Sequence, residues 1–195
     1  KHYRSFDYLY AAFAAHGEYL NAQLVAKVFS HLGIPARFID PQEIGLQVDD
    51  NARSATFDVK SYTSIAKLDL NTSERLIIPG FFGYTKNGDM ATFSRGGSDI
   101  TGAIMARGLS ADLYENFTDV SAIYAVNPTI IDQPAAIEQM TYDEMRELSY
   151  AGFAVFHDEA IIPAIQGGIR INIKNTNEPD APGTFIVPPL SLIHI

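Results

Sequence analysis

The chain has 195 residues, 47% hydrophobic and 19% charged, which is typical of a globular protein. Its formal net charge of −9 argues against nucleic acid or an anionic membrane as the main partner, although a local positive patch would suffice for a nucleotide. Cysteine is absent, so disulfides and thiolate chemistry are excluded, and the composition indicates a cytosolic protein. No apolar run reaches the length of a membrane span, and the first four residues do not resemble a signal peptide.

The beginning of the chain predicts two helices followed by a strand. Residues 5–15 are apolar and alanine-rich, and this helix is expected to end near His16 and Gly17. A second apolar pattern at helical spacing runs over residues 18–32 and is stopped by Gly33. Residues 36–39 then predict a short buried strand. Helix followed by strand through a short glycine-containing link is typical of an α/β layer.

The acidic residues of this region have ordinary structural interpretations. Glu18 would lie in the first turn of the second helix, where a negative charge is favourable, and His16 would be a helix-end residue. Asp49 and Asp50 could be mistaken for a metal pair, but adjacent carboxylates point apart in a strand, and a solvated turn is favoured. From the residues alone, none of these side chains requires a catalytic role.

The middle of the chain predicts a short helix, a strand and a hairpin. Residues 61–68 favour the helix, and residues 75–79 form an apolar strand that runs into Gly80 and Gly83. The hairpin is expected over residues 84–93, with its turn at Asn87-Gly88-Asp89.

The loop that follows the hairpin has the residue types of an anion site. Gly96 and Gly97 allow the backbone to pass close to a ligand, and Ser98 and Asp99 are residues that cap helix starts. Arg95 adds a planar guanidinium suited to a carboxylate or phosphate. The helix would continue to Leu109. An ordinary loop is the alternative interpretation, because Gly-Gly before a helix is common.

The second half of the chain continues the alternation of strands and helices. Thr118 and Asp119 follow the predicted strand 113–117, at the carboxyl end where open α/β sheets bind ligands, although such a dipeptide is more often a turn. His157 could contact phosphate, but a role at the start of a helix is favoured. The remaining predicted elements are a helix at 141–151 with a Thr-x-x-Glu capping box, a helix at 159–166, and strands at 169–175 and 185–187.

Five short motifs occur in the order found in one family. They are Pro79 to Gly83, Arg95 to Asp99, Thr118 to Val120, Met140 to Met145, and Pro182 to Thr184. On these motifs the chain resembles aspartate kinase of the amino-acid kinase superfamily, and the match runs from about His16 to Val187.

The resemblance and the alternating elements imply a three-layer α/β/α sandwich around a mostly parallel sheet, of the carbamate kinase-like type. Residues 1–187 would be a partial catalytic domain, with residues 1–79 as the amino-acid-substrate part, 80–187 as the nucleotide-binding part and 188–195 as a tail. The Lys-Phe-Gly-Gly segment that begins the family's domain does not occur, so an N-terminally truncated sheet is expected, and regulatory ACT domains are expected to be absent from these residues. An exposed sheet edge and uncovered apolar faces would favour a homo-oligomer.

The activity implied by the resemblance is transfer of the γ-phosphoryl group of ATP to the side-chain carboxylate of L-aspartate. The product, 4-phospho-L-aspartate, leads toward lysine, threonine and methionine. ATP and Mg²⁺ are the implied cofactors, with no protein ligand to the metal assigned. A carboxylate is already ionised at neutral pH, so positioning and charge neutralisation would carry the reaction without a general base.

The resemblance also implies roles for individual residues. Glu18 would hold the ammonium group of aspartate and Arg95 its α-carboxylate, while Asp99 would assist with the ammonium or order the loop. The amides of Gly96, Gly97 and Ser98 would line the pocket. The residues implied to face the nucleotide are Thr118, Asp119, Tyr124 and Val155.

The sequence departs from the family at two cationic positions. Thr129 and Ala154 stand where many members have an arginine and a lysine, and Lys86 or Arg95 would have to supply the missing charge. Loss of these two cations would weaken ATP binding or transfer, and the fragment alone, without the Lys-Phe-Gly-Gly segment, is expected to be inactive. Two alternatives remain open: an aspartate-binding module without catalysis, and a kinase for a related amino acid.

Overall fold

The computed structural model describes residues 3–94, 96–126, 134–150 and 158–189. The chain divides into two compact units, Lys1–Thr101 and Gly102–Ile195, and each is described by itself. The predicted functional division at residue 79 is a different boundary and stays a prediction.

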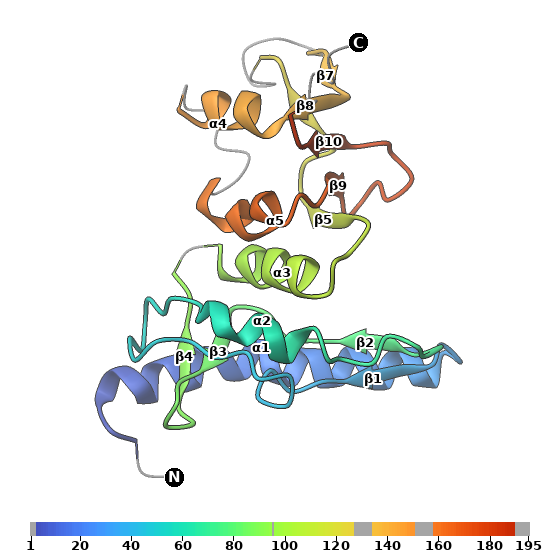
Figure 1. Ribbon diagram of the computed structural model, residues 1–195. Coiled ribbons are helices and arrows are strands. Elements are labelled where there is room, and N and C mark those ends of the chain that lie inside the picture. Colours follow the sequence, from blue (N-terminus) through green and yellow to red (C-terminus); the bar gives the residue numbers. More distant parts are fainter. Residues whose placement is uncertain (1–2, 95, 127–133, 151–157, 190–195) are drawn as a thin grey trace. The chain divides into compact units, whose positions relative to one another are not determined.

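Unit 1 contains one long helix and two small pairs of strands (Figure 1). Its elements are α1 (Phe6–His31), β1 (Ala36–Phe38), the 3₁₀ helix η1 (Val59–Ser61), α2 (Tyr62–Ile65), β2 (Arg75–Ile77), β3 (Phe82–Tyr84) and β4 (Met90–Thr92). β1 pairs in parallel with β2, β3 pairs with β4 as a hairpin, and α1 contacts β1, β2 and β4. Both predicted strands and the predicted hairpin are therefore confirmed.

α1 is one continuous helix, so the predicted break at His16 and Gly17 is wrong. A glycine inside a helix costs only about 1 kcal/mol relative to alanine, and packing of the inward face outweighs that cost. This face consists largely of alanines that are at most 6% exposed: Ala11, Ala12, Ala15, Ala22 and Ala26. The predicted stop at Gly33 is confirmed, because Gly33 has a φ of 78° and the helix ends at His31.

α3 (Gly97–Gly108) begins in unit 1 and ends in unit 2. The other elements of unit 2 are β5 (Tyr114–Thr118), β6 (Ile123–Tyr124), β7 (Ala136–Ile137), β8 (Gln139–Thr141), α4 (Tyr142–Tyr150), η2 (Asp158–Ile161), α5 (Ile162–Gln166), β9 (Ile171–Asn175) and β10 (Thr184–Val187). Four strands form one sheet in the order β5-β9-β10-β8. The outer pairs are parallel and the central pair β9–β10 is antiparallel.

The core of unit 2 lies against this sheet. Ile171, Ile173 and Ile186 are fully buried, and they pack with residues of α3, α4 and α5 in one apolar cluster. Two polar side chains of β9, Asn172 and Asn175, are also less than 10% exposed. Because Asn172 lies on the opposite face from Ile171 and Ile173, β9 carries a buried side chain on each of its faces.

The capping box at the start of α4 is confirmed. The Thr141 N–H donates to Glu144 Oε2 at 2.7 Å, and the Glu144 N–H donates to Thr141 Oγ1 at 3.3 Å. Gly152, expected to end this helix, lies outside the described residues. The single helix predicted at 159–166 is instead a 3₁₀ turn followed by α5, because Pro163 near the start of α5 has no N–H to continue an earlier helix.

Candidate functional site

The loop between β4 and α3 carries the residues predicted to bind an anionic substrate. Gly96 has a φ of 73°, which glycine adopts without strain, and the Ile100 N–H donates to its carbonyl at 2.9 Å. Gly97 and Ser98 open α3, where backbone N–H groups have no acceptor within the helix and can bind an anion. Arg95, the predicted guanidinium of this site, lies outside the described residues.

Two glycines bring this loop against the segment that precedes β3. A Cβ atom added to Gly80 would lie 3.1 Å from the Ser98 Cα atom. A Cβ atom on Gly97 would lie 2.7 Å from Cδ2 of Phe81. The motif at 79–83 and the motif at 95–99 are therefore in van der Waals contact, and only glycine permits this approach.

Phe81 is a candidate site residue that sequence reasoning missed. Its φ of 78° is a left-handed conformation, which costs a bulky residue about 1–3 kcal/mol and recurs at functional sites. The Phe93 N–H donates to its carbonyl at 2.9 Å, so the residue that follows β4 helps to hold the conformation. Its place in the Pro-Gly-Phe-Phe-Gly motif was the available signal, but that signal does not reveal the sign of φ.

Glu18 lies in the middle of α1 rather than in a first turn, so the predicted helix-start interpretation is wrong. Its side chain is partly exposed, at the border of the face that α1 packs onto the strands. The helix-end interpretation of His16 is wrong for the same reason, and His16 Nδ1 lies 2.5 Å from the Ala12 carbonyl oxygen. Glu18 and the described part of the loop 94–99 thus belong to the same unit, which is the minimum that a shared site requires.

Two tyrosines beside Asp40 connect α1 to the hairpin. Burial, and next the nearby Asp40 carboxylate, raise the pKa of Tyr84, which is 7% exposed. The same two causes raise the pKa of Tyr19. Both rings contact Phe82, with centroid distances of 6.4 Å for Tyr19 and 5.9 Å for Tyr84. The contact of its ring with Phe82 therefore holds Tyr19, the neighbour of Glu18, against the hairpin.

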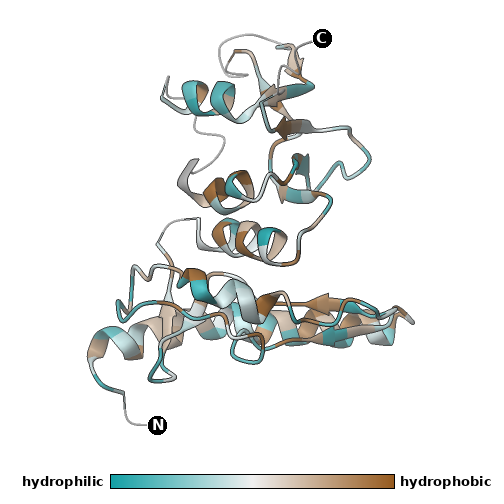
Figure 2. Ribbon diagram, viewed as in Figure 1, coloured by the Kyte–Doolittle hydropathy of each residue, from teal (hydrophilic) through white to brown (hydrophobic). Residues whose placement is uncertain are grey.

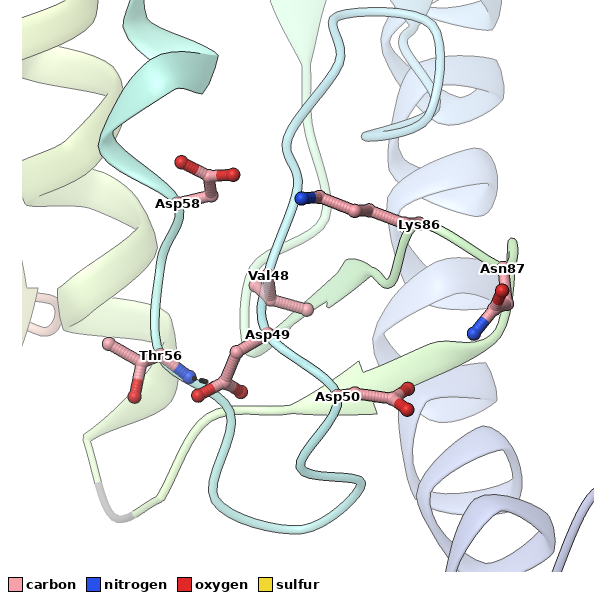
Figure 3. Close-up of a pocket in the computed structure, with 7 residues that line it drawn as sticks. All are labelled: Val48, Asp49, Asp50, Thr56, Asp58, Lys86 and Asn87. Carbon is pink, nitrogen blue, oxygen red and sulfur yellow. Dashed lines mark hydrogen bonds between the residues drawn. The ribbon is translucent and has the colours of Figure 1, made fainter.

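A cavity of about 600 Å³ lies elsewhere in unit 1 (Figure 3). It is lined by Val48, Asp49, Asp50, Thr56, Asp58, Lys86 and Asn87. The lining has three carboxylates and one ammonium, and the Arg4 guanidinium offsets the charge of one of these carboxylates, Asp50. Lys86 lines this cavity, and its role in replacing the cations missing at Thr129 and Ala154, both of which lie outside the described residues, stays a prediction.

The two adjacent aspartates of this cavity, Asp49 and Asp50, both accept hydrogen bonds from other residues of unit 1. Asp49 Oδ1 accepts the N–H groups of Asn51 at 3.3 Å and Thr56 at 3.0 Å, as expected for a turn. Asp50 instead binds the Arg4 guanidinium at both carboxylate oxygens and accepts the Tyr8 hydroxyl at 2.6 Å. The bonds from Arg4 and then Tyr8 lower the pKa of Asp50 to about 2.

In unit 2, the predicted nucleotide residues lie at the end of β5 and in β6. Thr118 is the last residue of β5, and its hydroxyl donates to Asp119 Oδ1 at 3.2 Å. The Thr118 carbonyl accepts the Thr176 N–H at 2.9 Å. Asp119 is exposed and Tyr124 is partly exposed in β6. Val155 lies outside the described residues, as do Asn127, Pro128 and His157.

The Pro182-Gly183-Thr184 motif has a structural explanation. A Cβ atom on Gly183, whose φ is 73°, would lie 2.1 Å from the Ile173 carbonyl oxygen. The fully buried Thr184 hydroxyl accepts the Ile123 N–H at 2.8 Å and donates to the Ile137 carbonyl at 2.6 Å. Gly183 therefore allows β10 to approach β9 closely, and Thr184 joins β6 to β7.

Within residues 3–94, 96–126, 134–150 and 158–189, no three His, Cys, Asp or Glu side chains come together in a way that could hold a metal ion. Of the helices in this part of the chain, none combines the length and the apolar character needed to span a membrane.

The family follows from comparison with known proteins. A model described as the amino acid kinase family matches residues 3–175, so the chain belongs to this family. It is 52% identical over 176 residues to Aspartokinase 3 of Bacillus subtilis (strain 168), covering 90% of this chain and 38% of that protein. It is 32% identical over 188 residues to the chloroplastic Aspartokinase 1 of Arabidopsis thaliana, covering 94% and 32% of the two chains.

Solved aspartate kinases have the same fold. The Clostridium acetobutylicum enzyme matches with a TM-score of 0.80 and 47% identity, over 91% of this chain and 39% of that one. E. coli aspartokinase III in complex with aspartate and ADP matches with a TM-score of 0.85 and 25% identity, over 97% and 43%. The predicted amino-acid kinase fold is confirmed, and the chain spans about two fifths or less of the length of these relatives.

Proposed function

We propose that the chain is the greater part of the catalytic domain of an aspartate kinase, which transfers the γ-phosphoryl group of ATP to the side-chain carboxylate of L-aspartate. The identity of 52% to Aspartokinase 3 over 90% of the chain supports the substrate assignment. The observation that carries the proposal is the junction of the two motifs, where Gly80 and Phe81 touch the first turn of α3.

At the substrate end, opposite charges of one amino acid would be held from different segments. The N–H groups of Gly97 and Ser98, together with Arg95, suit the α-carboxylate of aspartate. Gly96 gives the loop its left-handed turn, and Asp99 in the first turn of α3 would assist with the ammonium group or order the loop. Glu18 supplies a carboxylate for that ammonium. Aspartate needs no general base, so these residues bind and orient the reacting oxygen.

At the nucleotide end, Thr118, Asp119, Tyr124 and Val155 would contact ATP. Thr118 and Asp119 stand at the carboxyl end of a parallel strand, where α/β proteins hold their ligands. Magnesium would arrive bound to the phosphates of ATP, where it neutralises charge on the transferred group. The cytosolic location stays a prediction from the composition.

Aspartate-dependent release of ADP by the natural protein that carries this chain tests the proposal. Arg95→Ala should abolish turnover, and Glu18→Gln should raise the KM for aspartate at least tenfold while leaving the KM for ATP nearly unchanged. Arg37→Ala is the matched control, because Arg37 is an exposed arginine of the same unit that pairs only at the surface, 3.2 Å from Glu74.

The two alternatives give different results in the same assay. Aspartate binding without ADP release would support a binding module, which the threonine and alanine at positions 129 and 154 would suit. ADP release with glutamate or N-acetylglutamate, but not with aspartate, would support a kinase for a related amino acid. Either result would overturn the proposed activity.

We also propose that the outward face of α1 associates with a second copy of this chain. Figure 2 shows hydrophobic segments recurring along this helix. Its exposed apolar side chains, 44–83% accessible, are Phe6, Leu9, Tyr10, Phe13, Leu20, Leu24 and Val28. At roughly 150–250 Å² per exposed aromatic ring, and somewhat less per aliphatic side chain, this face approaches the 800 Å² or so that each partner buries in a stable dimer.

The order of side chains on this face suits an antiparallel pairing. Its aromatic members precede Gly17 and its last three aliphatic members follow it, so two antiparallel copies crossing at Gly17 would place rings against aliphatic chains. Nothing lies within 4 Å of a Cβ built on Gly17, so a second helix can approach closely there. Phe13→Glu should lower the sedimentation mass of the natural protein, whereas Val59→Glu, an exposed position off this face, should not. A wild-type monomer at high concentration would contradict the proposal.

A further inference from the structure

The hydroxyl of Thr101 connects the two motifs that meet at the start of α3. Thr101 Oγ1 accepts the N–H of Phe81 at 3.1 Å and donates to the carbonyl of Gly97 at 2.8 Å. A threonine hydroxyl has one donor and two acceptor positions, so both bonds can exist together. The residue is 3% exposed, so water does not compete for them.

The two residues that bond to this hydroxyl, Phe81 and Gly97, both have an unusual backbone environment. Phe81 is held in a left-handed conformation, with its carbonyl bonded to the Phe93 N–H and its amide bonded to Thr101. Gly97 opens α3, and its missing side chain leaves room for the Phe81 ring and backbone. Without the hydroxyl, the Phe81 amide would be left without its acceptor, and its backbone would be free to leave the strained conformation.

We infer that Thr101 is a positioning residue for the amino-acid substrate: its hydroxyl fixes the strained Phe81 backbone against the first turn of α3. The inference rests on the proposed function, because it assigns the α3 N–H groups to the carboxylate of aspartate. Thr101 itself lies one turn beyond those groups and acts only through Phe81 and Gly97. A shift of a few tenths of an ångström at this contact would move the N–H groups relative to the rest of the pocket.

Thr101→Val and Thr101→Ser in the natural protein separate the hydroxyl from the shape of the side chain. We expect valine to raise the Kd and the KM for aspartate at least tenfold while the KM for ATP changes less than twofold. Serine keeps the hydroxyl and should restore aspartate affinity to within about threefold of wild type. A merely structural role would lower the melting temperature of the valine variant and change both substrates alike or neither.

Calorimetric titration with aspartate is measured beside turnover, so that two failures can be told apart. If the wild type turns over aspartate and the valine variant binds it normally, or if serine is as impaired as valine, the inference is wrong and the proposed function stands. If the wild type binds aspartate without turnover, the proposed activity fails, and loss of binding in valine but not in serine still supports the positioning role. A wild type that does not bind aspartate overturns both. If neither Thr101→Val nor Thr101→Ala folds, the hydroxyl is needed for folding, and the inference is overturned.

Discussion

Replacing Gly183 by alanine should disrupt the sheet of unit 2. The added Cβ atom would lie 2.1 Å from the Ile173 carbonyl oxygen and 2.7 Å from Asn172 Oδ1, both on β9. Alanine also pays about 1–2 kcal/mol for the φ of 73°. The overlap with a backbone atom cannot be relieved by a rotamer change, so β10 must move from β9 and weaken a shared hydrogen bond. With about 1–3 kcal/mol for overpacking and about 1 kcal/mol for that bond, the total is roughly 3–6 kcal/mol.

Gly168 provides a matched control in the same unit. Its φ of 67° is nearly the same as that of Gly183, but no atom lies within 4 Å of a Cβ built on it. Gly168→Ala should therefore cost only the conformational part, about 1–2 kcal/mol. Amide hydrogen exchange in β9 and β10, followed by mass spectrometry, measures the opening free energy locally for both variants. Equal losses of protection in the two variants would refute the steric reasoning and leave only the cost of a positive φ.

Two further predictions concern charged hydrogen bonds and pH. Asp50 has its pKa lowered to about 2 by Arg4 and then Tyr8, so its contribution to stability is complete above the ordinary carboxyl pKa near 4 and is lost as pH falls toward 2. The unfolding midpoint of Asp50→Asn should lie below wild type at pH 7, and the gap should close over that range. A gap that persists at pH 2 would contradict the assignment. The bonds of Glu144 to Thr141 lower the pKa of its carboxyl group. In Glu144→Ala, the amides in the first turn of α4 should therefore exchange faster than in wild type at pH 7. This difference in hydrogen exchange should be smallest in acid. Glu144→Gln keeps an acceptor and should lose less.

Local patterns predicted most of the elements, because the forces that form them act between residues close in sequence. The capping box of α4 and the hairpin turn at Gly88 depend on contacts within four residues. The continuity of α1 does not depend on such local contacts. A glycine after histidine is a plausible end, and only the contacts of α1 with strands far along the chain stabilise the helix through Gly17.

The candidate site was predictable as a set of motifs but not as a geometry. Nothing local shows that Phe81 has a positive φ, since the cause is a contact with residues about ten to twenty positions away. The bonds from Arg4 to Asp50 and Asp89 join parts of the chain separated by 46 and 85 residues, so the interpretation of Asp50 as a solvated turn residue missed them. Pairings of this kind are invisible in periodicity and become apparent only when the backbone is folded.

Thr184 provides a comparison that separates structural from substrate-positioning threonines. Like Thr101, it is buried beside a glycine that admits a close neighbour, and its hydroxyl accepts one N–H and donates to one carbonyl. Its partners, Ile123 and Ile137, belong to β6 and β7 rather than to the start of α3. Thr184→Val should therefore cost about 2–4 kcal/mol of stability, from two lost bonds and two buried groups left unpaired. Serine should restore most of it.

Because the bonds of Thr184 join β6 to β7 within unit 2, the aspartate Kd of Thr184→Val should stay within about twofold of wild type at a temperature where the variant is folded. The comparison with Thr101→Val, made by the same titration at matched folded fraction, distinguishes the two roles. If Thr184→Val weakens aspartate binding as much as Thr101→Val does, loss of a buried hydroxyl acts through general destabilisation. The special role assigned to the contact between Phe81 and Gly97 would then be unnecessary.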